Sequence, residues 1–177
     1  MDPMPAFYSF LSNILFMQSQ QIRAMIDTSV YEFLYLKHLD SLNKMVDDGK
    51  IIAYGCKVVR QELRGISPKV KYKGKSFRKM LLSIYDELTE KHDYPLENIV
   101  ENLAEQYWQE YDGGMPKRKL MNDFRIVAIS SVHNLDVVIS EDNNSMKSGP
   151  AIRSYLKVNN ANRFRTPAFY SIEEIIP

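Results

Sequence analysis

The stretch RAMIDTSVYEF, from Arg23 to Phe33, determines how the rest of this chain can fold. Its apolar run, Ala24 to Ile26, stops at Asp27, and two hydroxyl residues follow. A carboxylate at this point has an ordinary explanation, because Asp27 can cap a helix that begins near Val30. The other explanation is a functional acid at the end of a buried strand. The rest of the sequence helps to decide between these two explanations.

Apolar runs and helical spacings alternate along the chain. Neighbouring apolar residues at 136–140 are typical of a parallel strand covered on both faces. This alternation predicts an α/β fold, a three-layer α/β/α sandwich with a short, mainly parallel central sheet. The predicted strands are 24–26, 50–54, 136–140 and 167–170, and the predicted helices are 30–46, 57–63, 77–88, 96–111, 122–133, 152–158 and 172–176.

Length and composition fit a single domain over residues 1–177. The chain is 45% hydrophobic and 25% charged, which is typical of soluble proteins. Its formal net charge is +1, so any nucleic-acid binding must come from a local basic patch. Cys56 is the single cysteine, which excludes an internal disulfide and a thiolate metal cluster. The absence of an internal disulfide favours a reducing, cytoplasmic setting.

The N-terminal segment, residues 1–22, is apolar but carries Ser9, Ser12 and Asn13 within its apolar run. These polar residues leave it well short of the ~20 consecutive apolar residues that span a membrane, and it has no basic start or small-residue cleavage site. We therefore expect no membrane partner. The expected structure is a helical extension packed on the domain or in a dimer contact, and a role at a membrane surface is the alternative.

Four acidic side chains fall near one end of the predicted sheet, where ligands of parallel α/β proteins bind. Asp27 ends the first strand, Glu62 lies on the helix after the second, Asp123 opens the buried helix, and Asp142 follows the strand at 136–140. Each has an ordinary alternative. Asp123 can be a first-turn acid favoured by the helix dipole, Asp142 a turn residue, and Glu62 a solvated charge.

The negative charge of four carboxylates at one end of a sheet has to be offset. Two of them about 5 Å apart repel by roughly 3 kcal/mol at an effective dielectric of 20, so protons or cations must offset the charge. Oxygen ligands without Cys or paired His favour Mg²⁺ or Mn²⁺ over Zn²⁺. One or two such ions are suited to phosphodiester hydrolysis.

The segments MIDTSVYEF, VVRQELRG, NDFRIVAIS and VVISEDNNSM resemble, in order and spacing, the PIN-domain nuclease superfamily. The likeness is to its small toxin-type members, of the virulence-associated protein C kind. FRTPAFYSIEEII is similar to the closing strand and helix of that family. The resemblance implies a metal-dependent endoribonuclease using Mg²⁺ or Mn²⁺. It also implies a homodimer and a small antitoxin partner.

The resemblance assigns a role to each of the four acids. Asp27, Glu62, Asp123 and Asp142 correspond, in that order, to the four catalytic acids of the family. Asp27, Asp123 and Asp142 are expected to bind metal, whereas Glu62 is expected to act through water or to position the nucleophile.

Three further residues are expected to support the acids. Ser29 and Ser140 can orient the carboxylates or metal-bound waters. Glu141 is an alternative fourth acid. Neighbours on a strand point to opposite faces, so only one of Glu141 and Asp142 is expected in the pocket. Asp142 is favoured because Ser140 stands two residues before it, as in the family pattern.

Basic residues gather in a segment, residues 66–118, that is expected to form a basic loop followed by a helical insert. A rim that contacts phosphates beside the acids is one interpretation, and a solvated loop is the other. The residues expected to bind single-stranded or structured RNA are Lys71, Lys73, Lys75, Arg78, Lys117, Arg118 and Lys119.

Several functional alternatives remain open from the sequence. A haloacid dehalogenase-type phosphatase would need an Asp two residues after Asp27, where Ser29 stands. A non-catalytic interaction or RNA-binding module of the same fold would be expected to lack one or more acids, and none is missing. A nuclease held inhibited by an antitoxin could use the apolar residues 6–17 for that contact. An RNA-processing enzyme is the alternative to a toxin.

Overall fold

The computed structural model describes residues 21–90 and 92–176. The helical extension expected at residues 1–22 lies outside the described residues, except for its last two positions. Those two positions are not helical, because Gln21 has no regular secondary structure and Ile22 is the first residue of strand β1. In the described ranges, no helix is both long and apolar enough to cross a bilayer.

Five parallel strands form the central sheet, in the order β5-β2-β1-β6-β7. The middle strand pairs with β2 on one side and β6 on the other, with Ala24 opposite both Ala53 and Val137. A crevice for ligands is expected where the chain order changes direction, at the carboxyl ends of β1 and β6. The strands are β1 (Ile22–Ile26), β2 (Ile51–Cys56), β5 (Asp93–Tyr94), β6 (Val137–Ile139) and β7 (Ala168–Tyr170).

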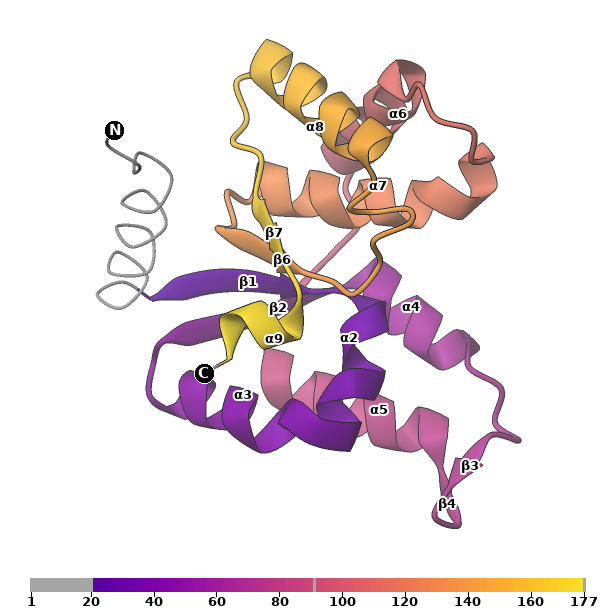
Figure 1. The fold of residues 1–177 in the computed structure, drawn as a ribbon, viewed down its shortest axis with the longest axis vertical. Helices are drawn as coiled ribbons and strands as arrows, with labels where there is room; N and C mark the ends of the chain where they lie inside the picture. Colours follow the sequence, from indigo (N-terminus) through magenta and orange to yellow (C-terminus); the bar gives the residue numbers. More distant parts are fainter. Residues whose placement is uncertain (1–20, 91, 177) are drawn as a thin grey trace, which may run out of the picture.

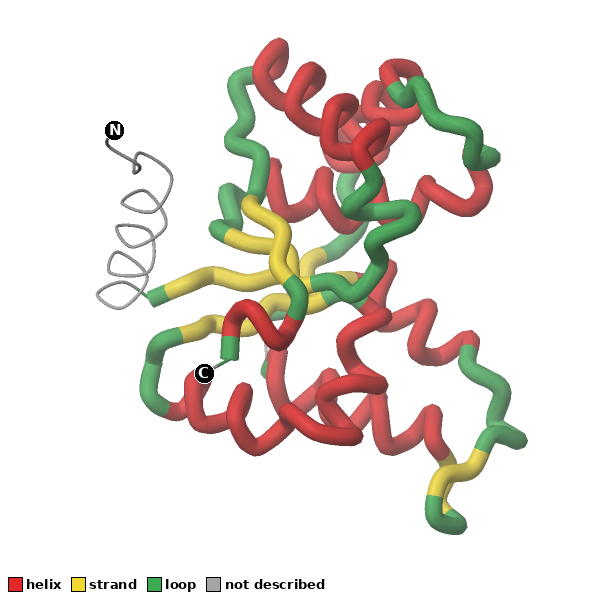
Figure 2. The backbone as a smooth tube through the Cα atoms, in the orientation of Figure 1, coloured by secondary structure: helices red, strands yellow, loops and turns green. Residues whose placement is uncertain are grey.

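Helices cover both faces of the sheet, as Figures 1 and 2 show. Helices α2, α3, α4 and α5 lie on one side, and α6, α7 and α8 on the other. The predicted three-layer sandwich is therefore confirmed. The helices are α2 (Thr28–Phe33), the π-helix η1 (Leu34–His38), α3 (Leu39–Asp47), α4 (Lys57–Gly65), α5 (Phe77–Thr89), α6 (Asn98–Glu110), α7 (Lys117–Val132), α8 (Gly149–Asn162) and α9 (Ile172–Ile175).

The core lies on both sides of β1, whose last three residues are fully buried. On one side, α7 is buried along most of its second half, as its continuous apolar sequence predicts. Phe124 on that helix packs edge-on against Tyr107 of α6 and Tyr155 of α8. Buried aromatic pairs of this kind add about 0.5–1.5 kcal/mol beyond their area. They hold the three helices of this layer together above the sheet.

The expected basic loop is instead a hairpin, formed by β3 (Lys71–Tyr72) and β4 (Lys75–Ser76). Its turn residues, Lys73 and Gly74, both have positive φ, 46° and 78°. Two such residues make the tight turn that matches the twist of antiparallel strands. Next to this turn, the Tyr72 ring meets Tyr35 edge-on, with centroids 5.3 Å apart. The hairpin is therefore anchored to η1.

Helix α7 begins at Lys117, earlier than the sequence predicts, because Lys and Arg are good helix formers even without apolar spacing. Two expectations change. Asp123 does not open this helix but lies in its second turn, so the dipole of a helix N-terminus does not explain it. The basic residues Lys117, Arg118 and Lys119 form the first turn of the helix and are not part of a preceding loop.

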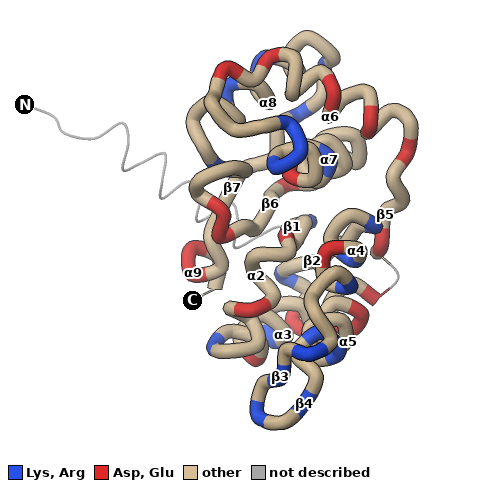
Figure 3. The backbone as a smooth tube through the Cα atoms, turned by 90° about the vertical axis from the view of Figure 1, so that its right-hand side faces the viewer, with Lys and Arg blue, Asp and Glu red and all other residues tan. Residues whose placement is uncertain are grey.

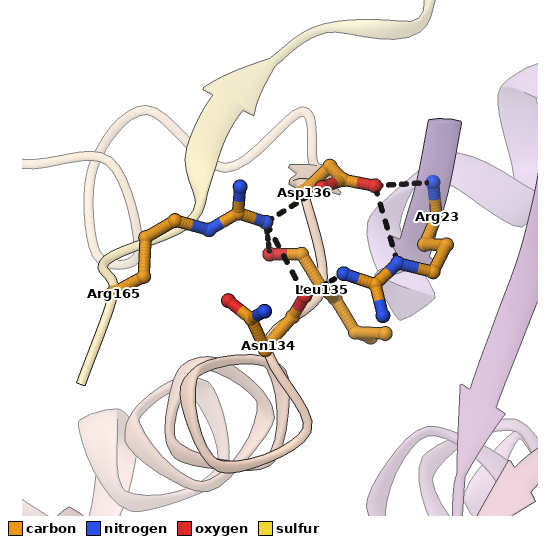
Figure 4. Close-up of polar contacts among 5 residues, drawn as sticks. All are labelled: Arg23, Asn134, Leu135, Asp136 and Arg165. Carbon is orange, nitrogen blue, oxygen red and sulfur yellow. Dashed lines mark hydrogen bonds and ion pairs between the residues drawn. The ribbon is translucent and has the colours of Figure 1, made fainter. Parts of the chain in front are cut away.

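The amino ends of β1, β6 and β7 are joined by one carboxylate, Asp136 (Figure 4). Its Oδ2 accepts hydrogen bonds from the backbone N–H of Arg23, at 2.8 Å, and from its Nε, at 3.4 Å. Its Oδ1 accepts from Nη2 of Arg165 at 2.6 Å. Burial would raise the pKa of Asp136, but these bonds outweigh it and lower the pKa. This cluster stabilises the end of the sheet opposite to the acids.

Gly55 marks a close approach between β2 and α5. Tyr85 of α5 has its hydroxyl 3.1 Å from the carbonyl of Cys56 and 2.6 Å from Asp93 Oδ1. A Cβ at Gly55 would overlap that hydroxyl. We expect Gly55→Ala to lower the free energy of unfolding by about 2 kcal/mol, because overpacking displaces Tyr85 from both partners. Urea unfolding would measure it.

The matched control is Gly65→Ala at the end of α4, where an added Cβ meets nothing within 4 Å. This variant should be neutral or slightly stabilising. Equal effects of the two substitutions would contradict a packing role for Gly55.

Candidate active site

Asp27 lies at the carboxyl end of the central strand and is only 5% exposed. It caps α2, as its ordinary explanation requires, but its contacts exceed those of a cap. Oδ2 accepts from the Ser29 hydroxyl at 2.6 Å and from the Ser140 hydroxyl, which follows β6, at 2.9 Å. Burial raises the pKa of Asp27, and these bonds oppose the rise. Both serine hydroxyls bind the same oxygen, Oδ2, so neither of them occupies Oδ1.

Ser29 and Ser140 also fix the loop after β6. Ser29 Oγ accepts from the backbone N–H of Glu141 at 3.0 Å, and Ser140 Oγ accepts from that of Asp142 at 3.1 Å. The Glu141 carboxylate lies elsewhere, because its Oε1 accepts from the N–H of Ile172, at the start of α9. Of the two adjacent acids, only Asp142 joins the group.

Glu62 on α4 is half-buried and held by two side chains, so it is not a solvated charge. Oε1 accepts from Nδ2 of Asn122 at 2.6 Å, and Oε2 accepts from the Thr28 hydroxyl. Asn122 is itself oriented, since its Oδ1 accepts from Nη1 of Arg125 at 3.2 Å. Burial raises the pKa of Glu62, the two hydrogen bonds oppose this, and the charge of Asp27 adds to it.

Asp123 and Asp142 meet at one hydroxyl that sequence reasoning missed, that of Ser145. Its Oγ lies within hydrogen-bonding distance of Oδ2 of both carboxylates. Asp142 is also a turn residue, because its Oδ1 accepts from the backbone N–H groups of Asn144 and Ser145 at 2.9 and 2.8 Å. The spacing of an Asp with a Ser three residues later was the only sequence signal for this contact.

The two carboxylates differ in their electrostatics. Burial raises the pKa of Asp123 to about 7, and the charges of Asp27, Asp142 and Glu62 add to the rise. Burial would also raise the pKa of Asp142, but hydrogen bonds from Ser145 and Asn144 outweigh it and lower the pKa. All four acids therefore share one electrostatic environment, and pairs of acids with separated pKa values are typical of functional sites.

The basic residues divide into two groups. Lys71, Lys73 and Lys75 are exposed on the hairpin, whereas Arg78 is half-buried, with Nη1 3.4 Å from the carbonyl of Arg64. In the second group, Lys117 pairs with Glu105 of α6. This second group also includes the exposed residues Arg118 and Lys119 at the start of α7. Figure 3 shows the basic segments of the first group on β3 and β4.

The acid group fits a hard divalent ion in its chemistry. Within residues 21–90 and 92–176, no three or more His, Cys, Asp or Glu side chains form a ready metal cage. Mg²⁺ does not require one, since it typically binds through one or two carboxylates and keeps several waters. The donors present are carboxylate and hydroxyl oxygens, and their mutual repulsion favours a cation. Asp27 and Asp123 are the residues that would hold it, with Asp142 beside them.

Scans against protein-family models and curated proteins give no match. Solved structures do match. One is the crystal structure of VapBC2 from Rickettsia felis bound to a DNA fragment from their promoter, at TM-score 0.52 and 14% identity, covering 85% of this chain and 98% of that one. Another is FitAB bound to the IR36 DNA fragment, at TM-score 0.53 and 16% identity, covering 84% and 94%. The fold expected from the resemblance to PIN-domain nucleases is thus confirmed, and at this identity the likeness concerns the fold alone.

The raised pKa of Asp123 predicts that its charge destabilises the metal-free protein. The unfolded chain releases this proton near pH 4 and the folded chain near pH 7, so stability falls as pH rises between these values. We expect Asp123→Asn to stabilise the protein at pH 8 in chelator by about 2–4 kcal/mol. The gain in melting temperature, roughly 5–10 °C, should be smaller at pH 5. Differential scanning calorimetry at both pH values would measure it.

Asp112→Asn is the matched control, because this carboxylate is exposed and pairs with Arg153. It should change the melting temperature little at either pH. An Asp123→Asn protein less stable than wild type at pH 8 would contradict a strained charge in the acid group.

Proposed function

We propose that this protein is a metal-dependent endoribonuclease that hydrolyses RNA phosphodiester bonds with Mg²⁺ or Mn²⁺. The observation that carries the proposal is the coupled acid group at the carboxyl edge of the sheet. Asp27, Glu62, Asp123 and Asp142 come from four separate segments, and the other three charges add to the raised pKa of Asp123. A fold does not need such a group for stability, since it is repulsive.

The contacts of each side chain indicate its role in the proposed reaction. Asp27 and Asp123 would bind the ion, which would polarise the phosphodiester and offset the charge that develops on it. Glu62 is engaged at both oxygens by Asn122 and Thr28, so it is positioned and would act through water. The Ser140 hydroxyl keeps the Asp27 carboxylate in one orientation.

Charge segregation supports RNA as the substrate. Residues 64–79 contain no Asp or Glu. Because the whole chain is only +1, the remainder carries more acidic than basic residues. The first turn of α7 is also basic, although cations at a helix N-terminus are unfavourable for the helix itself. Both basic groups adjoin elements that carry an acid, α4 and α7. The basic residues of 64–79 are Arg64, Lys69, Lys71, Lys73, Lys75, Arg78 and Lys79.

The proposed biological setting is the toxin of a toxin–antitoxin pair, acting in the cytoplasm, with a small antitoxin and a homodimer as the proposed assemblies. Support comes from the sequence resemblance and from the fold shared with VapBC2 and FitAB. An RNA-processing enzyme would use the same site. A non-catalytic module is the second candidate, favoured by the lack of a ready three-ligand cage in the described residues.

Cleavage of a mixed-sequence single-stranded RNA by purified protein tests the activity. We expect cleavage with Mn²⁺ or Mg²⁺ and none in chelator. Asp27→Asn and Asp123→Asn should each reduce kcat by at least about 100-fold, because each removes a ligand charge. The Asp112→Asn variant serves again as the control. Full cleavage by both acid variants would refute this site, and metal binding without cleavage would favour the non-catalytic module.

The hairpin is expected to supply affinity and not chemistry. Replacing Lys71, Lys73 and Lys75 together by Gln should raise KM and leave kcat nearly unchanged. The slope of log affinity against log salt should fall in magnitude by about 2, since each phosphate contact on a single strand contributes about 0.7. Fluorescence anisotropy with labelled RNA at several salt concentrations would measure the slope.

The control replaces three other lysines, Lys37, Lys44 and Lys50, from η1, α3 and the turn before β2. It changes the net charge equally, so a similar loss in both triple variants would mean that overall charge, and not the hairpin, attracts RNA.

A further inference from the structure

We propose that Ser145 joins Asp123 and Asp142 into a single divalent-cation site, acting as a positioning residue for the acid group. The inference rests on the proposed function, since it concerns the same centre. It concerns a residue outside the expected set of four acids and their two serines. It is based on the contacts of the Ser145 hydroxyl, which has one hydrogen to donate and two carboxylate neighbours.

The Ser145 hydroxyl has one hydrogen and two acid neighbours. Its Oγ is within hydrogen-bonding distance of Asp123 Oδ2 and of Asp142 Oδ2. If both carboxylates are ionised, the hydroxyl can donate to only one of them, and its contact with the other is between lone pairs. Such a contact is repulsive in a half-buried site. A proton on Asp123 removes the conflict in the metal-free protein, and a divalent cation shared by the two carboxylates removes it when both are ionised.

The position of Ser145 is determined by the turn that contains it. Its backbone N–H donates to Asp142 Oδ1 at 2.8 Å, and its carbonyl accepts from the Ser148 hydroxyl at 2.8 Å. The residue is only 7% exposed. The turn thus fixes the backbone of Ser145, and burial limits the directions open to its side chain. The hydroxyl lies between Asp123, on α7, and Asp142, on the loop after β6.

The consequence concerns how tightly the centre binds a cation. Groups that orient metal-binding carboxylates typically contribute 10- to 100-fold to metal affinity. Without the Ser145 hydroxyl, the Asp142 carboxylate would keep its two backbone hydrogen bonds but lose its link to Asp123. The loop and α7 would then present their acids independently.

Calorimetric titration of the full chain with Mn²⁺ tests this inference. We expect Ser145→Ala to weaken Mn²⁺ binding about tenfold. Ser145→Thr keeps the hydroxyl and should bind within about threefold of wild type. Ser148→Ala is the matched control, because it alters the same turn without touching an acid. It should retain wild-type affinity, whatever its effect on melting temperature.

The outcomes separate this inference from the proposed function. Equal Mn²⁺ affinity of Ser145→Ala and wild type would overturn the role of Ser145 while leaving the metal centre intact. Equal weakening by Ser145→Ala and Ser148→Ala would overturn it too, since the turn alone would then explain the loss. Wild type that binds no Mn²⁺ would overturn both proposals. Mn²⁺ binding that depends on Ser145, without cleavage of RNA by the wild type, would overturn only the nuclease.

Discussion

The Asp27 carboxylate is buried at the end of the central strand, and two segments, the start of α2 and the loop after β6, supply it with hydrogen-bond donors. A buried charge is tolerated only when it is well solvated by protein groups. Here the hydroxyls of Ser29 and Ser140 donate to Oδ2 and at the same time accept from two backbone N–H groups of the following loop. The carboxylate thus fixes the start of α2 and the path of the chain after β6, and with that path the position of Asp142.

The same arrangement concentrates negative charge. Asp123, Asp142 and Glu62 are held by Ser145, Asn122 and Thr28 and not by basic side chains. Hydrogen bonds orient the acids but do not cancel their charge, so repulsion remains within the group. Proteins commonly accept such local strain at functional sites and compensate elsewhere. In this chain, the double arginine pairing of Asp136 and the aromatic contacts above the sheet stabilise regions away from the acids.

Basic side chains are also concentrated in one part of the structure, the hairpin of β3 and β4. The hairpin carries its lysines on a tight turn and is anchored by Tyr72 against Tyr35, so its charges project from a firm base. Their mutual repulsion is unfavourable for the isolated protein, as is that of the cations in the first turn of α7. A chain that is almost neutral overall therefore presents a basic hairpin and a separate acid group, and the proposed nuclease would use the first to hold RNA and the second to cleave it.

Local sequence is sufficient for the alternation of strands and helices, and it singles out the four acids whose charges act on one another in the structure. The apolar run at 136–140 and the helical spacing at 77–88 specify their structure within a few residues. Strand β5 was missed because Asp93 and Tyr94 become a strand only through pairing with β2. Only the tertiary structure decided which polar groups hold the acids. Thr28 and Glu62, or Asp123 and Ser145, are far apart in the chain, and their contact depends on how helices dock on a sheet of given register. That docking is set by packing over the whole core, which no local pattern encodes.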